Sequence, residues 1–268
     1  MIIIGEKINT SIKTVNEAVI SENESAVQDI VNKQIAHGAN YLDVNCGTFV
    51  DCEVQKIRWL INTIRKVSDV PLCIDSPNPV VVKDGLALLN SSNVIINSIT
   101  AEKERWEAFE PLITGYDASV IALCMNDQGI PDDSEQRTKI ALDIAEKFSA
   151  KGVSPDRIYF DPMVKPISTN SQNAVITLET MRNIRKEIPE AHITCGLSNI
   201  SYGMPVRKLL NQAFLVSAIF AGLDTAIVNP MDKNLMSLVF ASEALTGKDE
   251  YCMEFISKYR EGYFDVLQ

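Results

Sequence analysis

Acidic and amide side chains follow most of the short apolar runs in this sequence, within a few residues of the end of each run. In chain order these polar residues are Glu6, Asn9, Asp43, Asn45, Asp75, Ser76, Asn97, Ser98, Asn126, Asp161, Asn199 and Asn229. Each of them has an ordinary alternative role, because Asp, Asn and Ser also cap the helix that follows a strand. As a set they supply many oxygen acceptors with few opposing bases, which predicts a binding site for a polar ligand.

The chemistry of these side chains restricts the ligand. Ionised carboxylates only accept hydrogen bonds, and they do so best in bidentate pairs, so the ligand should present several N–H donors along a flat edge. A pterin has an amino group and an adjacent ring N–H for Asp75 and Asp161. Its ring nitrogens can accept from Asn97, and its carbonyl oxygen needs a donor such as Arg207. Without such a partner the buried carboxylates would carry a large desolvation cost.

A metal site is the first competing interpretation. His192 opens an apolar run instead of closing one, and amide side chains at Asn97, Asn126 and Asn199 interrupt the series of carboxylates. Metals that bind oxygen ligands prefer a denser set of carboxylates. We therefore expect that this chain requires no metal.

Covalent chemistry has three candidates, each with a structural alternative. Lys165 lies four positions after Asp161, where a Schiff-base lysine would be of interest, but its place in a loop favours exposure or contact with an anionic ligand tail. Ser198 lacks a G-x-S-x-G elbow. Cys195 ends a predicted strand, and we expect it to be packed.

The elements that must position these residues alternate regularly along the chain. Short apolar runs predict strands at Ile2–Ile4, Tyr41–Val44, Leu72–Ile74, Val94–Ile96, Ser119–Leu123, Arg157–Phe160, His192–Cys195 and Thr225–Val228. Amphipathic stretches predict helices over 24–37, 53–67, 79–89, 104–115, 134–151, 172–187, 205–221 and 232–246. Eight such units predict a single (β/α)₈ barrel of the α/β class, with its functional groups at the carboxyl ends of the strands. A doubly wound open sheet would usually carry a Gly-rich loop after its first strand, and residues 5–9 do not form one.

Composition limits the setting in which the protein works. The chain has 268 residues and a formal net charge of −10, so we expect one domain over 1–268 and no nucleic-acid partner. The apolar start is too short for a secretion signal, and no stretch approaches the roughly 20 apolar residues of a membrane span. The six cysteines form no CxxC pair, which suits reduced thiols. These features predict a cytoplasmic protein without a membrane anchor.

Several segments resemble the pterin-binding methyltransferases that act with corrinoid proteins. They are IIIGEKIN (2–9), GANYLDVNCG (38–47), PLCIDS (71–76), VIINS (94–98), MNDQGIP (125–131), YFDP (159–162) and GLSNISYGMPVR (196–207). The resemblance covers nearly the whole chain in the same order. It is strongest to the stand-alone methyltetrahydrofolate:corrinoid protein methyltransferases and looser to the folate domain of cobalamin-dependent methionine synthase.

The resemblance implies a barrel that binds a pterin at its carboxyl-end rim, is usually a homodimer, and transfers a methyl group between 5-methyltetrahydrofolate and the cobalt of a corrinoid (cobalamin) protein. Residue by residue, it places Asp75, Asn97 and Asp161 at the pterin edge, with Arg207 and Gly196 completing the pocket and Asn199 facing the ring nitrogen that carries the methyl group. The weaker candidates for the same pocket are Glu6, Asn9 and Asp43.

Three other functions stay open at this point. A dihydropteroate-synthase-like enzyme is disfavoured, since the loop typical of that family after the second strand is replaced by residues 45–48. An aldolase or lyase on the same barrel would use Lys165, or a metal held by Asp43 and Asp75. A pterin-binding module without turnover would keep the aspartates but not need Asn199. The tail from Tyr251 to Gln268 is expected to pack on the barrel.

Overall fold

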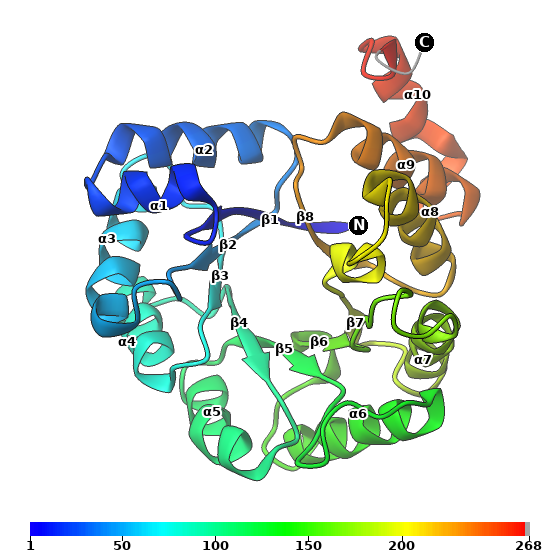
Figure 1. Ribbon diagram of the computed structural model, residues 1–268, viewed down its shortest axis with the longest axis horizontal. Coiled ribbons are helices and arrows are strands. Elements are labelled where there is room, and N and C mark those ends of the chain that lie inside the picture. The colour runs from blue at the N-terminus through cyan, green and yellow to red at the C-terminus, as the bar shows by residue number, and fades with distance from the viewer. Residues whose placement is uncertain (266–268) are drawn as a thin grey trace.

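The computed structural model describes residues 1–265 and shows a ring of helices around eight parallel strands (Figure 1). The strands are β1 (Ile2–Asn9), β2 (Tyr41–Asn45), β3 (Leu72–Asp75), β4 (Val94–Ile99), β5 (Ser119–Leu123), β6 (Ile158–Asp161), β7 (His192–Ile193) and β8 (Thr225–Val228). Neighbouring strands pair in the order β7-β6-β5-β4-β3-β2-β1-β8, and all the pairs are parallel. The expected (β/α)₈ barrel is confirmed.

The helices follow the strands as predicted, with additions at both ends of the chain. They are α1 (Lys13–Ile20), α2 (Glu24–Ala36), α3 (Glu53–Arg65), α4 (Pro79–Leu89), α5 (Lys103–Gly115), α6 (Ser134–Ser149), α7 (Asn173–Glu187), α8 (Arg207–Phe220), α9 (Lys233–Leu245) and α10 (Met253–Arg260). The 3₁₀ turns are η1 (Val50–Cys52), η2 (Pro155–Arg157), η3 (Leu197–Ser201) and η4 (Glu250–Cys252). The short helices α1 and α10 were not predicted from the sequence.

Strand β1 runs past its predicted end at Ile4 and reaches Asn9. Its pairing with β2 shifts register between Gly5 and Ile8. At this bulge the Lys7 amide donates to the side-chain oxygen of Gln34 at 2.9 Å instead of to the neighbouring strand. A β-bulge of this kind interrupts a ladder without ending the strand, so Glu6 lies inside β1 and not after it.

The barrel interior holds an apolar layer that separates its two ends. Five buried side chains from five strands pack together there: Ile4, Cys73, Ile95, Ile121 and Tyr159. Two larger apolar clusters fill the space between the strands and the surrounding helices. The alternation of side chains along a strand therefore sends one set of residues inward and the other toward the helices.

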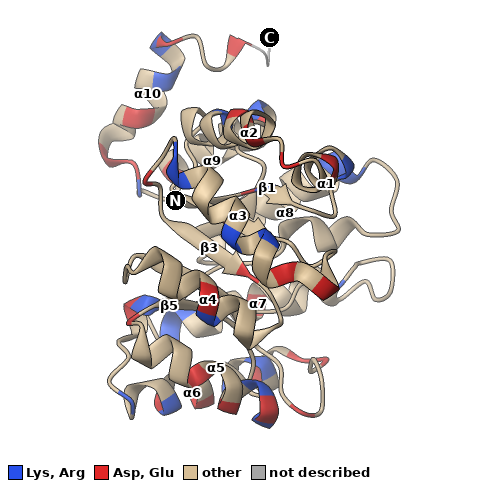
Figure 2. Cartoon of the chain, turned by 90° about the vertical axis from the view of Figure 1, so that its left-hand side faces the viewer, with Lys and Arg blue, Asp and Glu red and all other residues tan. Residues whose placement is uncertain are grey.

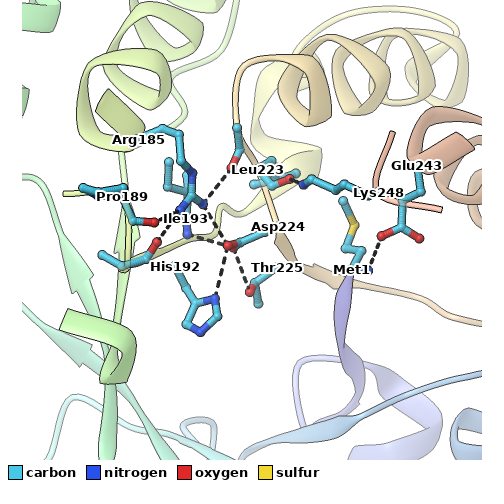
Figure 3. A network of polar contacts seen from close by, with 12 residues as sticks. Met1, Arg185, Pro189, His192, Ile193, Leu223, Asp224, Thr225, Glu243 and Lys248 are labelled. Carbon is cyan, nitrogen blue, oxygen red and sulfur yellow. Dashed lines mark hydrogen bonds and ion pairs between the residues drawn. The ribbon is translucent and has the colours of Figure 1, made fainter. Parts of the chain in front are cut away.

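Asp224, just before β8, connects this strand to β7 (Figure 3). Its backbone amide donates to the Ile193 carbonyl at 3.3 Å, and its carboxylate accepts from the Ile193 amide at 2.9 Å. Arg185 and His192 also contact the carboxylate, at 2.8 and 3.1 Å. Burial opposes the charge, but these donors outweigh it and hold the pKa of Asp224 below its ordinary value. The seam between β7 and β8 depends on this one side chain.

Asp224→Ala is expected to destabilise the fold by about 3 kcal/mol, because it leaves the Ile193 amide without its acceptor. It also removes the carboxylate partner of Arg185, which keeps only main-chain carbonyls as acceptors. For a chain of this size that loss lowers the melting temperature by roughly 6–12 °C in a calorimetric scan. The control is Asp29→Ala, which removes a more than half-exposed carboxylate paired with Lys33 at 2.6 Å. Exposed ion pairs of this kind contribute about 0–1 kcal/mol to the free energy of unfolding. Equal effects of the two substitutions would contradict the assigned role of Asp224.

The expectation that the tail packs on the barrel holds only in part. Tyr263 packs edge-on against Phe240 of α9, with 5.4 Å between ring centroids. Helix α10 contacts α9, where Lys258 lies over the Phe240 ring at 5.8 Å, but it projects beyond the ring of helices (Figure 2). Tyr251 of η4 and Met253 and Tyr259 of α10 are exposed. The last three positions of the tail, 266–268, lie outside the described residues.

Candidate functional site

Polar side chains form a second inward layer above the apolar one. Two positions beyond Ile4, Cys73, Ile95 and Tyr159 come Glu6, Asp75, Asn97 and Asp161. Because side chains on a strand alternate between faces, each of these residues points to the same side as the apolar residue two positions earlier. They therefore line the barrel at the carboxyl ends of the strands, where barrel enzymes place their functional groups.

Hydrogen bonds between neighbouring strands connect this polar layer. The Asn45 amide donates to Asp75 at 2.8 Å, and the Asn97 amide donates to Asp43 at 3.2 Å. Asp75 also lies opposite both Asn45 and Asn97 in the strand register. The structure thus brings together Asp43, Asp75 and Asn97, three of the residues singled out from the sequence.

Asp43 lies within β2 and not at its end, and its side chain is buried, with 3% of the residue exposed. Burial and the nearby charge of Asp75 raise its pKa to about 8; bonds from Asn97 and Cys73 act in the opposite direction, and the more distant Glu6 raises it slightly. Burial also raises the pKa of Asp75, with Asn45 and Arg105 acting against it and Glu53 adding to it. Asp43 therefore keeps its proton at neutral pH.

Asp43→Asn is expected to change the stability little at pH 4 and to stabilise the protein increasingly as the pH rises to 8. An acid whose folded-state pKa is raised holds a proton that the unfolded chain releases, so stability falls as pH rises from about 4 to about 8. Asparagine cannot ionise, and the variant should gain at least about 1 kcal/mol at pH 8, or roughly 2–4 °C in melting temperature. The control is Asp51→Asn, at an exposed carboxyl on η1. Parallel pH profiles of wild type and Asp43→Asn would refute this assignment.

Asp161 ends β6 and accepts hydrogen bonds from two backbone amides. Met163 donates at 2.8 Å, and Gly196 donates from the segment after β7. Burial raises the pKa of Asp161 to about 6, while the two amides and the Arg137 guanidinium limit the rise. Asp161 is therefore ionised at neutral pH and can still accept from a ligand.

Asn199 lies exposed in the middle of η3, at the rim of the barrel. Its backbone amide donates to the Gly196 carbonyl at 3.2 Å. A Cβ atom added at Gly196 would lie 3.0 Å from the side-chain nitrogen of Asn199. The absence of a side chain at Gly196 therefore leaves room for the Asn199 carboxamide. Gly196 thus connects Asp161 to Asn199.

Arg207 contacts the η3 turn in this structure. It donates to the Ser198 carbonyl at 2.9 Å and to the Ser201 hydroxyl at 3.1 Å. These bonds brace the turn that carries Asn199. The predicted role of Arg207 as a donor to the pterin carbonyl is a separate proposal.

The two remaining candidate site residues, Glu6 and Asn9, lie in different surroundings. Glu6 lines a cavity of about 100 Å³ together with Ser198 and Asn229, and burial raises its pKa although Lys7 acts against this. The Asn9 side chain instead accepts from the amide and hydroxyl of Ser11, at 2.9 and 2.7 Å. Asn9 thus closes a local turn and is not joined to the other site residues.

Lys165, the candidate Schiff-base lysine, lies apart from this layer, whereas Asp43 and Asp75, the candidate metal ligands, belong to it. Lys165 pairs with Asp132 at 2.7 Å on the outer loops. A cavity of about 630 Å³ opens beside Asp224 and Met1 at the opposite end of the strands. Among residues 1–265, no three His, Cys, Asp or Glu side chains group in a way that could hold a metal. No helix in this part of the chain has the length and apolar character to cross a membrane.

Two arginines that contact the site were missed from the sequence. Arg105 and Arg137 donate to the carbonyls of Ser98 and Pro162, which directly follow Asn97 and Asp161. Both lie in the first turn or so of a helix, where the helix dipole disfavours a positive charge. That unfavourable placement was the signal available in the sequence.

A (β/α)₈ barrel with acidic and amide side chains at its carboxyl-end rim defines the class, a ligand-binding barrel of the enzyme type. Comparison with known proteins gives the family. The model for the family described as "Pterin binding enzyme" matches residues 6–229. The chain belongs to the pterin-binding enzyme family.

Individual relatives agree with this family. The chain is 33% identical to a protein named methylcorrinoid:tetrahydrofolate methyltransferase from Eubacterium limosum, over 100% of this chain and 99% of the relative. It is 30% identical to methionine synthase from Mycobacterium tuberculosis, over 85% of this chain but only 20% of that much longer protein. Among solved structures, dihydropteroate synthase from Xanthomonas albilineans superposes with a TM-score of 0.70 at 16% identity, covering 91% of this chain and 93% of that one. This last likeness concerns the fold.

Proposed function

We propose that this protein, as one barrel domain over residues 1–268, is a methyltransferase that moves a methyl group between 5-methyltetrahydrofolate and the cobalt of a corrinoid protein. One observation carries the proposal: the similarity to a methylcorrinoid:tetrahydrofolate methyltransferase extends along the full length of both chains. The polar layer at the rim supports it, because it supplies acceptors that match a pterin edge.

The pterin is held by the inward polar layer in this proposal. Asp75 and Asp161 accept from the amino group and ring N–H, while Asn97 donates to a ring nitrogen. The Asn97 side-chain nitrogen donates one hydrogen to Asp43, which fixes the plane of the carboxamide and leaves its second N–H for a pterin ring nitrogen. Glu6 faces the same space, and Arg207 donates to the pterin carbonyl if its exposed side chain turns inward.

Asn199 assists the chemical step. Methyl transfer from a tertiary amine is slow because the departing nitrogen would become an anion, so that nitrogen must gain a proton or a strong hydrogen bond as the bond breaks. The Asn199 carboxamide donates such a bond, which strengthens as the nitrogen becomes more basic. A carboxamide does not ionise usefully, and the proton itself arrives through water.

The partner and setting follow from the same reaction. The methyl group is exchanged with a reduced corrinoid cobalt on a separate protein, and this chain itself requires no metal. All six cysteines are free thiols, and four of them are buried, which suits a cytoplasmic location. A homodimer is part of the proposal through the family resemblance.

A dihydropteroate-synthase-like activity is the second candidate, favoured by the structural likeness to that enzyme. The identity of 16% makes this a likeness of fold, and the full-length relative outweighs it.

The test is an absorbance assay of the cobalt centre with chemically reduced free cobalamin and 5-methyltetrahydrofolate. Formation of methylcobalamin, dependent on the protein, supports the proposal. A complementary assay supplies dihydropterin pyrophosphate and 4-aminobenzoate. Product in the second assay and none in the first would overturn the proposal in favour of the synthase.

A further inference from the structure

Three arginines at the carboxyl-end rim share one arrangement. Arg105, Arg137 and Arg207 each lie within the first four residues of a helix, namely α5, α6 and α8. Each guanidinium donates to main-chain carbonyls in the loop that leaves a strand. A cation in the first helical turn is disfavoured by about 0.3–1 kcal/mol, so the carbonyl bonds must compensate for its placement.

Arg105 links the exits of β3 and β4. Its guanidinium donates to the Ser98 carbonyl at 2.7 and 3.1 Å and to the Pro77 carbonyl at 2.6 Å. Ser98 directly follows Asn97, and Pro77 lies two residues after Asp75. The guanidinium also stacks over the Phe109 ring at 3.8 Å, which fixes its plane.

Arg137 links the exits of β5 and β6 in the same way. It donates to the carbonyls of Pro131, Pro162 and Met163 at 2.8, 2.9 and 2.8 Å, and none of its surface is exposed. Pro162 follows Asp161 directly, and the Met163 amide is the one that donates to the Asp161 carboxylate. Arg137 therefore fixes both the position of Asp161 and the backbone donor that holds it.

We infer that Arg105 and Arg137 are positioning residues of the pterin site, holding Asp75, Asn97 and Asp161 in place through the main chain of the strand exits, as Arg207 does for Asn199. Only a planar guanidinium with several fixed donors spans two loops in this way, since a lysine ammonium acts as a point charge on a flexible stem. The inference rests on the proposed function, in which Asp75, Asn97 and Asp161 bind a pterin.

The test measures the affinity for 5-methyltetrahydrofolate by titration calorimetry in Arg105→Lys and Arg137→Lys. Both variants keep the charge but lose the fixed geometry, and binding should weaken roughly tenfold or more. The matched control is Arg65→Lys. Arg65 also donates to two carbonyls, those of Ser68 and Val70 at 3.1 and 2.9 Å, but before β3, at the opposite end of the barrel. The affinity of the Arg65→Lys variant for 5-methyltetrahydrofolate should stay at the wild-type value.

A pH profile separates positioning from simple loss of stability. The groups that face Asp161 are Arg137 from α6, Cys124 after β5 and Cys195 after β7. Burial raises the pKa of both thiols, so they are neutral, and Arg137 is the one charged neighbour. In Arg137→Met, the pH below which folate affinity is lost should move upward from about 6, a shift that lower stability alone does not produce.

The outcomes are distinct. A wild-type protein that binds no folate refutes the proposed function. Folded arginine variants that bind like wild type, or an Arg65→Lys variant that is weakened equally, refute the positioning role. If Arg137→Lys does not fold, the half-buried Arg105 decides the question alone through Arg105→Lys.

Discussion

Replacement of Asn199 by alanine should lower the rate of methyl transfer roughly a hundredfold, as removal of one donor to a developing charge does in other enzymes. The dissociation constant for 5-methyltetrahydrofolate should stay within about twofold of wild type, because the pterin edge is held by other residues. The carboxamide lies exposed at the rim on η3, so its removal leaves no buried group without a partner. Single-turnover rates and calorimetric titration measure the two quantities separately.

Asn170→Ala is the control for this substitution, since Asn170 is an exposed asparagine in a loop on the same face and serves only a local turn. Its rate and affinity should match wild type. If Asn199→Ala instead weakened folate binding and left the bound rate intact, Asn199 would be a binding residue, and the proposed assistance at the nitrogen would be wrong.

Asp161→Asn should weaken folate binding roughly tenfold to a hundredfold, the range for losing a hydrogen bond to a charged group. The substitution keeps the shape and one acceptor oxygen for the Met163 amide. It removes the negative charge that would accept from the pterin amino group and ring N–H together. Asp127→Asn, on the exposed neighbouring loop, is the matched control.

The pH dependence of the same variant gives a second result. In the wild type, Asp161 is ionised above pH about 6, and its protonated form accepts poorly. Folate affinity should therefore change little between that pH and about 8, where Asp43 titrates, and should fall as the pH decreases through about 6. In Asp161→Asn this decrease should be absent. A variant that keeps the acidic decrease, or that binds as tightly as wild type at pH 7.5, would show that another group carries the titration.

The sequence predicted the barrel well because its periodicities are strong. Eight apolar runs appear as strands, and α4 begins and ends where it was expected. The extension of β1 to Asn9 could not be predicted, since it depends on the distant Gln34 side chain replacing a ladder bond at Lys7. Strand β7 is shorter than expected, because only His192 and Ile193 pair in the ladder with β6.

The sequence indicated which polar residues lie at the strand ends but not how they are connected. Asp75, Asn97 and Asp161 lie in one inward layer, as their places at the strand ends indicated. Asn9 stays a prediction: its side chain closes a local turn with Ser11, and a turn residue of this kind looks the same in sequence as a site residue. Arg105 and Arg137 contact loops that are far apart along the chain. Their unfavourable placement in a first helical turn was visible in the sequence, but the carbonyls that compensate for it were not.

The apolar layer formed by Ile4, Cys73, Ile95, Ile121 and Tyr159 also restricts the order of events in the reaction. This layer blocks the barrel interior below the polar side chains, so the site opens only at the carboxyl ends of the strands. In the proposed reaction, folate and the corrinoid partner then use the same opening. We expect the smaller molecule to enter before the partner covers the mouth and to leave only after the partner departs, which predicts kinetically ordered turnover with folate first in and last out.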